Sequence, residues 1–169
     1  MPISRPDAVA PVAAGDPRTG GAAARVPVFR LIYRSHSLIM PVDREAAHGE
    51  IFRISRLNNA AWGVTGALLL HEDCICQTLE GEESAVRSLF AIIEADRRHH
   101  AVEIVDIATV AMPSFARWSM AKVSDTDGDV HLVATRMGTT VTAHRGTTAE
   151  QDRLLMVMRA LTLDLARSH

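Results

Sequence analysis

The sequence is poor in the residues that serve most often as chemical tools. Its 169 residues include one Tyr, two Cys and two Trp, and aromatic residues make up only 4% of the chain. It has no glycine-rich phosphate loop, no G-x-S-x-G nucleophile motif and no obvious Cys-His nucleophile pair. These absences exclude the common hydrolytic and group-transfer motifs, so we expect the protein not to be an enzyme.

Long apolar runs and a strong excess of one charge are also missing. No run approaches the roughly 20 residues of a transmembrane helix, and the N-terminus lacks the apolar core of a signal peptide. The net charge of -2 gives no reason to expect nucleic acid or a membrane as a partner. Cys74 and Cys76 are spaced C-x-C on one strand, where disulfides are rare. We therefore expect a reducing, cytoplasmic location.

Composition divides the chain into three segments. Residues 1–27 contain five prolines among Ala and Gly, with few large hydrophobes, and are expected to be a disordered tail. Residues 28–123 carry alternating strand and helix patterns and are expected to form the functional domain. Residues 124–169 are expected to be a linker and a C-terminal helical cap. The composition, 47% hydrophobic and 22% charged, is typical of globular proteins.

The patterns of the functional domain predict the order β-α-β-β-α-β-β. Strands are expected at 28–34, 65–71, 74–80, 102–112 and 118–123, with helices at 43–59 and from residue 82. Two helices on one face of a sheet give an α+β sandwich of ferredoxin-like type.

The C-terminal segment contains two further predicted helices. A short one is expected at 130–137, and a longer one runs from Thr148 to Arg167. The longer helix has a broad apolar face, which must cover the bare face of the sheet or a partner subunit. We expect at least a dimer, with contacts from Leu154, Leu161 or Leu165.

An uncharged amide, Gln77, interrupts an apolar strand. Alternate strand residues share a face, so Gln77 points the same way as Ile75 and Leu79. A buried amide without partners costs roughly 1–3 kcal/mol, so either the protein or a polar ligand must bond to it. Rotating or tautomerising the amide exchanges its donor and acceptor ends without changing its shape. Gln77 is therefore suited to a switch that rewires hydrogen bonds.

Two polar groups have competing interpretations. His71, Cys74 and Cys76 could suggest a metal, but their spacing fits no common zinc pattern and paired cysteines on one strand face are usually core, so no metal site is expected. The run Arg97-Arg98-His99-His100 could either satisfy the end of the second helix or contact the polar edge of a ligand.

Two more groups have simple structural interpretations when each is taken alone. Asn58 and Asn59 end the first predicted helix, where Asn is a common capping residue. Trp118 and Met120 share a face of the last predicted strand, where ordinary core packing is the simpler interpretation.

Taken together, these groups resemble the BLUF family, blue-light sensors that use FAD. The matching pieces are Leu31-Ile32-Tyr33-Arg34-Ser35, Asn58-Asn59 with Gly63-Val64-Thr65-Gly66-Ala67-Leu68, Gln77-Thr78-Leu79-Glu80-Gly81, Asp96-Arg97-Arg98-His99-His100 and Phe115-Ala116-Arg117-Trp118-Ser119-Met120. The resemblance covers residues 28–123. It implies that FAD contacts Tyr33, Ser35, Asn58, Asn59, Gln77, Arg98 and His99, and that Trp118 and Met120 lie near the flavin.

The resemblance also implies a mechanism. Blue light excites the flavin, Tyr33 donates an electron and a proton, and Gln77 relays the proton and rearranges. Recombination leaves a changed hydrogen bond to the flavin carbonyl, which red-shifts the absorption. The last strand, with Met120, and the C-terminal helix would carry this change to an unidentified downstream protein. The family thus implies a short stand-alone photoreceptor.

Other classes of protein stay open on the sequence alone. A ferredoxin-like module could bind a flavin or another metabolite without photochemistry, in which case Gln77 merely bonds its ligand. A structural adaptor and a flavin enzyme with redox turnover are further alternatives. Colour and a reversible response to blue light separate these possibilities.

Overall fold

The computed structural model describes residues 26–117, 119–126, 129–136, 139–144 and 148–167. Most of the predicted tail, and Trp118, lie outside these ranges, and Val26 and Pro27 are exposed. The helices in the described ranges include no segment that could span a membrane.

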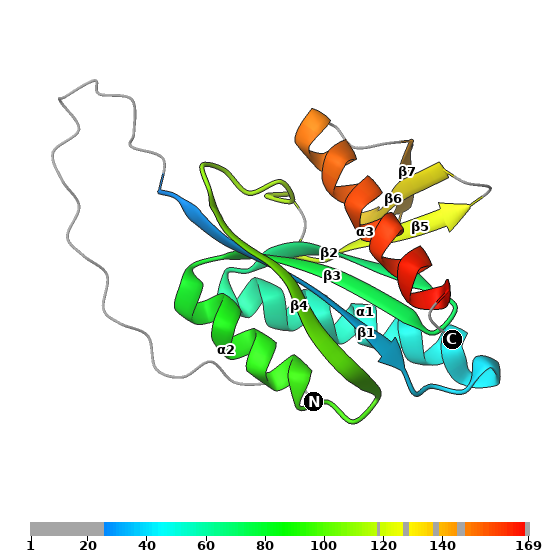
Figure 1. The fold of residues 1–169 in the computed structure, drawn as a ribbon. Coiled ribbons are helices and arrows are strands. Elements are labelled where there is room, and N and C mark those ends of the chain that lie inside the picture. The colour runs from blue at the N-terminus through cyan, green and yellow to red at the C-terminus, as the bar shows by residue number, and fades with distance from the viewer. Residues whose placement is uncertain (1–25, 118, 127–128, 137–138, 145–147, 168–169) are drawn as a thin grey trace, which may run out of the picture.

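A seven-stranded sheet forms the centre of the fold, in the order β4-β1-β3-β2-β5-β6-β7 (Figure 1). Neighbouring strands are antiparallel except for β2 and β5, which are parallel. The strands are β1 Val28–Ser37, β2 Thr65–His71, β3 Cys74–Gly81, β4 His99–Val110, β5 Ala121–Thr126, β6 Asp129–Arg136 and β7 Thr139–His144.

Helices cover both faces of this sheet (Figure 1). The elements are α1 Arg44–Trp62, preceded by the single 3₁₀ turn η1 Pro41–Asp43, then α2 Glu83–Glu94 and α3 Ala149–Arg167. Helices α1 and α2 pack on one face and α3 packs on the other. The ferredoxin-like α+β class predicted from the sequence is thus confirmed.

Local sequence explains where several elements begin and end. Gly63 has φ 65°, a left-handed conformation that favours glycine, and it ends α1. Glu82 caps α2 because its carboxylate accepts hydrogen bonds from the backbone N–H groups of Ser84 and Ala85. Gly66 lets β2 approach β3 closely, since a Cβ there would lie 2.1 Å from the Thr78 carbonyl oxygen.

The two faces of the sheet carry separate apolar cores. The core beneath α1 and α2 contains Phe29, Leu31, Tyr33, Phe52, Trp62, Val64, Leu68, Leu79, Val86, Leu89, Phe90 and Met120. The core beneath α3 contains Ile32, Ala67, Leu69, Cys76, Phe115, Ala121, Val123, Leu154, Leu155 and Met158. Because side chains alternate along a strand, each central strand contributes to both cores.

Several predicted elements differ from the observed ones in type or in bounds. Residues 130–137 were expected as a short helix, but β6 occupies Asp129–Arg136 and pairs with β5 and β7. The apolar residues alternate in its first half, with a period of two, which favours a strand. The last predicted strand begins at Ala121, not at residue 118. Helix α2 ends at Glu94, so residues 97–100 form a turn and the start of β4.

The apolar face of α3 covers the second face of the sheet, one of the two coverings that the sequence allowed. Leu154 is only 5% exposed and Leu161 packs against the same core. Leu154 is therefore unavailable for the oligomer contact expected of it. The side chain of Leu165 lies outside the described part of the chain.

Candidate functional site

The register of the sheet places Tyr33 directly opposite Gln77. The two residues pair across β1 and β3, and both are 3% exposed. The Tyr33 hydroxyl donates to Gln77 Oε1 at 2.5 Å, and Gln77 Nε2 donates to Met120 Sδ at 3.6 Å. The amide therefore connects a phenol on β1 with a thioether just before β5, and both of its ends have partners.

The surroundings of Tyr33 keep its phenol neutral. Burial raises its pKa far above the usual value, and negative charge on Cys76 and on the Asp96 carboxylate raises it further. The Tyr33 ring packs against Phe90 with a centroid separation of 5.3 Å and lies 6.4 Å from the His99 ring. A protonated phenol fixed in this way can serve as a hydrogen-bond donor or as a source of an electron and a proton.

A cavity of about 580 Å³, counting its open mouth, lies beside this pair. Its lining residues are Tyr33, Ser37, Ile39, His48, Ile51, Ser55, Leu68, Leu70, Ile75, Gln77, Ile93, Asp96, Arg98 and His99. Six of these fourteen residues are aliphatic, and the other eight carry polar groups.

An unsatisfied polar group would let the cavity bond to a polar ligand. His48 Nε2 is buried and has no hydrogen-bond partner among the described residues, although buried polar atoms normally have one. Burial lowers the pKa of His48, and Arg44 and Lys122 lower it further. A neutral imidazole beside apolar walls could bond to the polar edge of such a ligand.

The mouth of the cavity contains the residues from the DRRHH run. Arg98 donates to the Asp96 carboxylate through both its backbone N–H and its side chain. This pairing lowers the pKa of Asp96 and raises that of Arg98. His99 bonds to Ser35 Oγ at 2.9 Å and to the Ile93 carbonyl at 2.7 Å. Ser35 is fully buried outside the cavity lining, where it orients His99.

The two asparagines do not line the cavity. Asn58 and Asn59 are 7% and 1% exposed near the end of α1. Asn59 Nδ2 donates to the Ser119 carbonyl at 2.6 Å and so holds the segment that carries Met120 against the helix. The end of α1 is capped instead by backbone N–H groups, from Gly63 and Val64. Trp118, the other residue predicted in this segment, lies outside the described residues.

Sequence reasoning missed a buried ionic group on the opposite face of the sheet. Arg30 and Glu80 pair across β1 and β3 and are 4% and 0% exposed, with Arg30 Nε 2.9 Å from Glu80 Oε1. The Glu80 carboxylate also accepts from the backbone N–H groups of Ser114 and Phe115. Gln151 on α3 donates to the Ser114 carbonyl. The only sign of this group in the sequence is a charged residue inside each of the two apolar strands, Arg30 in β1 and Glu80 in β3.

Comparisons with known proteins agree with the fold. Residues 28–121 match the family model described as sensors of blue-light using FAD, BLUF. A search of curated protein sequences found no match.

Solved structures provide two relatives at substantial identity. The photo-activated state of BlsA is 30% identical, with 59% of this chain and 71% of that chain covered and a TM-score of 0.57. The dark-state structure of BlrB, a BLUF protein, is 37% identical, with 60% and 75% covered and a TM-score of 0.54. A bacterial light-regulated adenylyl cyclase, 20% identical over 35% of its length with a TM-score of 0.56, shares the fold alone. Because the family model spans more than half of the sequence, the chain belongs to the BLUF family of blue-light sensors.

Proposed function

We propose that the protein is a blue-light photoreceptor that binds FAD in the cavity beside Tyr33 and Gln77. The hydrogen-bonded series from Tyr33 through Gln77 to Met120 is the observation that carries this proposal. Membership of a family described as using FAD supports the choice of cofactor. Tyr33, Gln77, Arg98 and His99 would contact the flavin directly. Ser35 and Asn59 would act by positioning neighbouring groups.

In this proposal the flavin and the buried side chains have separate roles. When bound, the flavin absorbs blue light and accepts an electron. Tyr33 stays neutral because its pKa is raised, so it can give up an electron and a proton together. Gln77 receives the phenol's hydrogen bond and can exchange its donor and acceptor ends in place. After that exchange, Met120 Sδ would face the carbonyl end of the amide and would lose its donor.

Contacts on both sides of residue 118 support a route from this switch to α3. Ser119 precedes Met120 and bonds to Asn59. The same loop, at Ser114, contacts Glu80 and Gln151. A shift at Met120 would therefore act on a loop that is fastened to both the sheet and α3. We infer that α3 is the receiving element and that its partner is another copy of the chain or a downstream protein.

Two spectra test the proposal. The protein, purified and kept in the dark, should show oxidised flavin absorption, and blue light should shift that absorption reversibly to longer wavelength. Flavin released by denaturation identifies the bound form as FAD or as FMN. Folded protein that takes up flavin but shows no light-induced shift would instead support a passive flavin-binding module. Substrate turnover coupled to bleaching would support an enzyme.

A further inference from the structure

A row of potential metal ligands crosses four adjacent strands at one end of the sheet. His100 on β4 pairs with His36 on β1, His36 pairs with Cys74 on β3, and Cys74 pairs with His71 on β2. Directly paired residues point to the same face, with Cβ atoms about 4.5–5.5 Å apart. Three imidazoles and a thiol therefore stand in line on one face, opposite the cavity.

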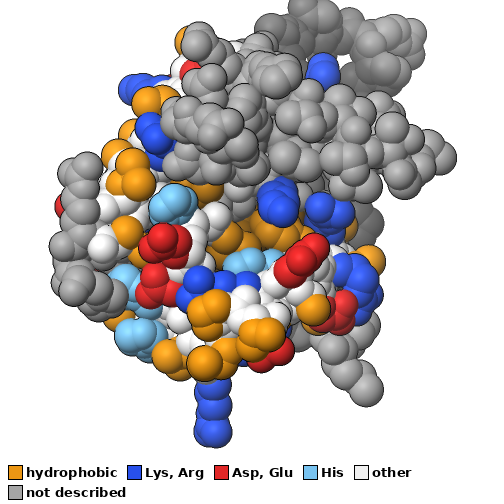
Figure 2. Space-filling view, turned by 90° about the vertical axis from the view of Figure 1, so that its right-hand side faces the viewer, with side chains coloured by type: hydrophobic (Ala, Val, Ile, Leu, Met, Phe, Trp, Pro, Cys, Tyr) orange, Lys and Arg blue, Asp and Glu red, His pale blue; other side chains and the backbone are white. Residues whose placement is uncertain are grey.

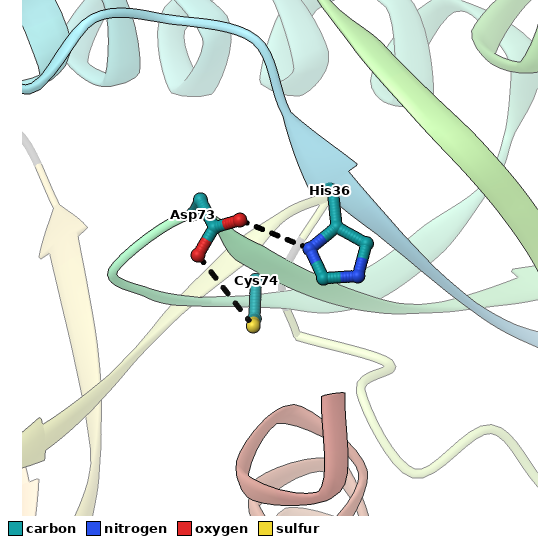
Figure 3. A group of neighbouring side chains, drawn as sticks. All are labelled: His36, Asp73 and Cys74. Atoms are coloured by element: carbon teal, nitrogen blue, oxygen red, sulfur yellow. Dashed lines mark hydrogen bonds and ion pairs between the residues drawn. The ribbon is translucent and has the colours of Figure 1, made fainter. Parts of the chain in front are cut away.

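Asp73 brings a carboxylate to the centre of this row (Figure 3). Asp73 Oδ2 lies 3.0 Å from His36 Nδ1, and Asp73 Oδ1 lies 3.9 Å from Cys74 Sγ. One ligand atom from each of these three residues falls within 4.8 Å of the others. His36 and Cys74 are buried, at 4% and 0% exposure. The Asp73 carboxylate is partly exposed and forms the open side.

The set of donor atoms selects the kind of ion. A nitrogen, a sulfur and a carboxylate oxygen together suit a borderline cation such as Zn²⁺ and do not suit Mg²⁺ or Ca²⁺, which prefer oxygen ligands. Tetrahedral zinc with bonds of about 2.0–2.3 Å needs ligand atoms about 3.3–3.7 Å apart. The three ligand atoms lie within 4.8 Å of one another, so side-chain rotations that close the widest gap by about 1 Å would complete the site.

We propose that His36, Asp73 and Cys74 form a Zn²⁺ site, with His100 as the fourth ligand. The rings of His36 and His100 have centroids 5.6 Å apart, so rotation of the exposed His100 side chain can bring a nitrogen to the ion. Figure 2 shows histidine and acidic side chains near one another on the end of the molecule that it views. The proposal is independent of the flavin chemistry.

Zinc at this position would tie three strands together behind the cavity wall. The Ser37 backbone N–H already donates to the Asp73 carbonyl at 2.6 Å, which joins β1 to the β2–β3 turn. Ser37 and Ile75 line the cavity, and each is adjacent in sequence to a proposed ligand. The ion would therefore stiffen the strand ends that hold these two cavity residues.

Titration of the full chain with ZnCl₂ after chelator treatment tests the site. Calorimetry should give one Zn²⁺ per chain, and Co²⁺ should produce a thiolate charge-transfer band after subtraction of the flavin spectrum. Cys74→Ser should abolish this band, and Asp73→Asn should weaken binding by about tenfold or more. His100→Ala should weaken Zn²⁺ binding similarly.

Cys76→Ser is the matched control, because Cys76 is an equally buried thiol on the same strand face outside the cluster. This variant should bind Zn²⁺ as the wild type does.

Two results would overturn the proposal. One is the absence of Zn²⁺ binding by the wild-type chain. The other is equal affinity in the wild type and in Asp73→Asn, which would place any bound zinc on other histidines. Asp73→Asn changes a turn residue at the surface, so it keeps the test decisive even if Cys74→Ser does not fold. Circular dichroism in chelator confirms that each variant is folded before it is compared.

Discussion

Tyr33 and Gln77 stand directly opposite each other on β1 and β3, and the Tyr33 hydroxyl donates to Gln77 Oε1 at 2.5 Å. The register of the sheet fixes this pairing. A slip of one residue would move either side chain to the opposite face, beneath α3. The geometry proposed for light sensing is therefore a property of strand pairing.

Gln77→Leu should retain flavin but lose the light-induced red shift. Leucine has a similar volume and fills the apolar slot, but it has no donor or acceptor to exchange. Absorption spectra before and after blue light measure the result. Thr78→Val, one position along the same strand and on the opposite face, should keep the shift. A full red shift in Gln77→Leu would remove Gln77 from the mechanism.

Tyr33→Phe should also lose the photochemistry while keeping the fold and the flavin. The ring stays packed against Phe90, and only the hydroxyl is removed. Tyr33 is the single tyrosine of the chain, so uniform labelling with ring-deuterated tyrosine marks this residue alone. Light-minus-dark infrared spectra should contain label-sensitive phenol bands. Spectra that are insensitive to the label would show that the Tyr33 hydroxyl does not respond to light.

The strands around the site could be predicted because their signals are local. The hairpin of β2 and β3 was predicted to within one residue, since two apolar runs flank a two-residue polar turn at Glu72 and Asp73. Membership of the BLUF family was recognised from short motifs in a fixed order. The α3 helix was predicted from its apolar face. Its first turn is stabilised by Thr148 Oγ1, which accepts from the Gln151 N–H at 3.2 Å.

Features that depend on register could not be predicted in the same way. Arg30 meets Glu80 across 50 residues of sequence, and no spacing rule connects them. The His36, Asp73 and Cys74 cluster joins residues 37 positions apart, whereas the sequence drew attention to His71, Cys74 and Cys76 and favoured no metal. The error at β6 has another cause, because a short apolar run fits both a helix and a strand until a neighbouring strand pairs with it.

Asn59→Ala separates two roles for this amide. The family resemblance implies that Asn59 binds the flavin, whereas its side chain donates to the Ser119 carbonyl. We expect loss of that hydrogen bond to lower the free energy of unfolding by about 1 kcal/mol and to speed hydrogen exchange at Met120. Chemical denaturation of the flavin-free protein measures the first effect. If stability is unchanged and only flavin affinity falls, Asn59 acts on the ligand and does not position the loop.

Glu80→Gln should destabilise the fold strongly, by about 3–5 kcal/mol, because the buried Arg30 guanidinium loses its paired charge. Arg30 keeps its contact with Glu150, at 3.1 Å. The loss of unfolding free energy should therefore lie near the lower end of this range. Glu50→Gln removes one partner of an exposed pair with Arg53 and should have little effect. Denaturant unfolding of the three proteins checks the comparison.

The same variant tests the proposed route to α3. The amide introduced by Glu80→Gln would keep an oxygen able to accept from the Ser114 N–H, but the charge that orients the loop would be gone. We expect the red shift to persist in Glu80→Gln, while light-induced changes in hydrogen exchange over 149–167 become smaller. Equal changes in the wild type and in Glu80→Gln would show that the signal reaches α3 by another path.

Stability should fall as the pH rises above about 9. Burial raises the pKa of the Cys76 thiol from 9.0 to about 12 and raises that of Tyr33 above its ordinary value of 10.0. Between the unfolded and folded pKa values, the native chain keeps protons that the unfolded chain has lost. The free energy of unfolding then decreases with pH, by about 1.4 kcal/mol per pH unit for each such proton.

Urea unfolding in the dark from about pH 8 to about pH 11 should reveal this slope. Cys76→Ser removes the thiol and Tyr33→Phe removes the phenol, so each variant should show a shallower slope than the wild type. A slope that is the same in all three proteins would assign the alkaline loss of stability to other groups.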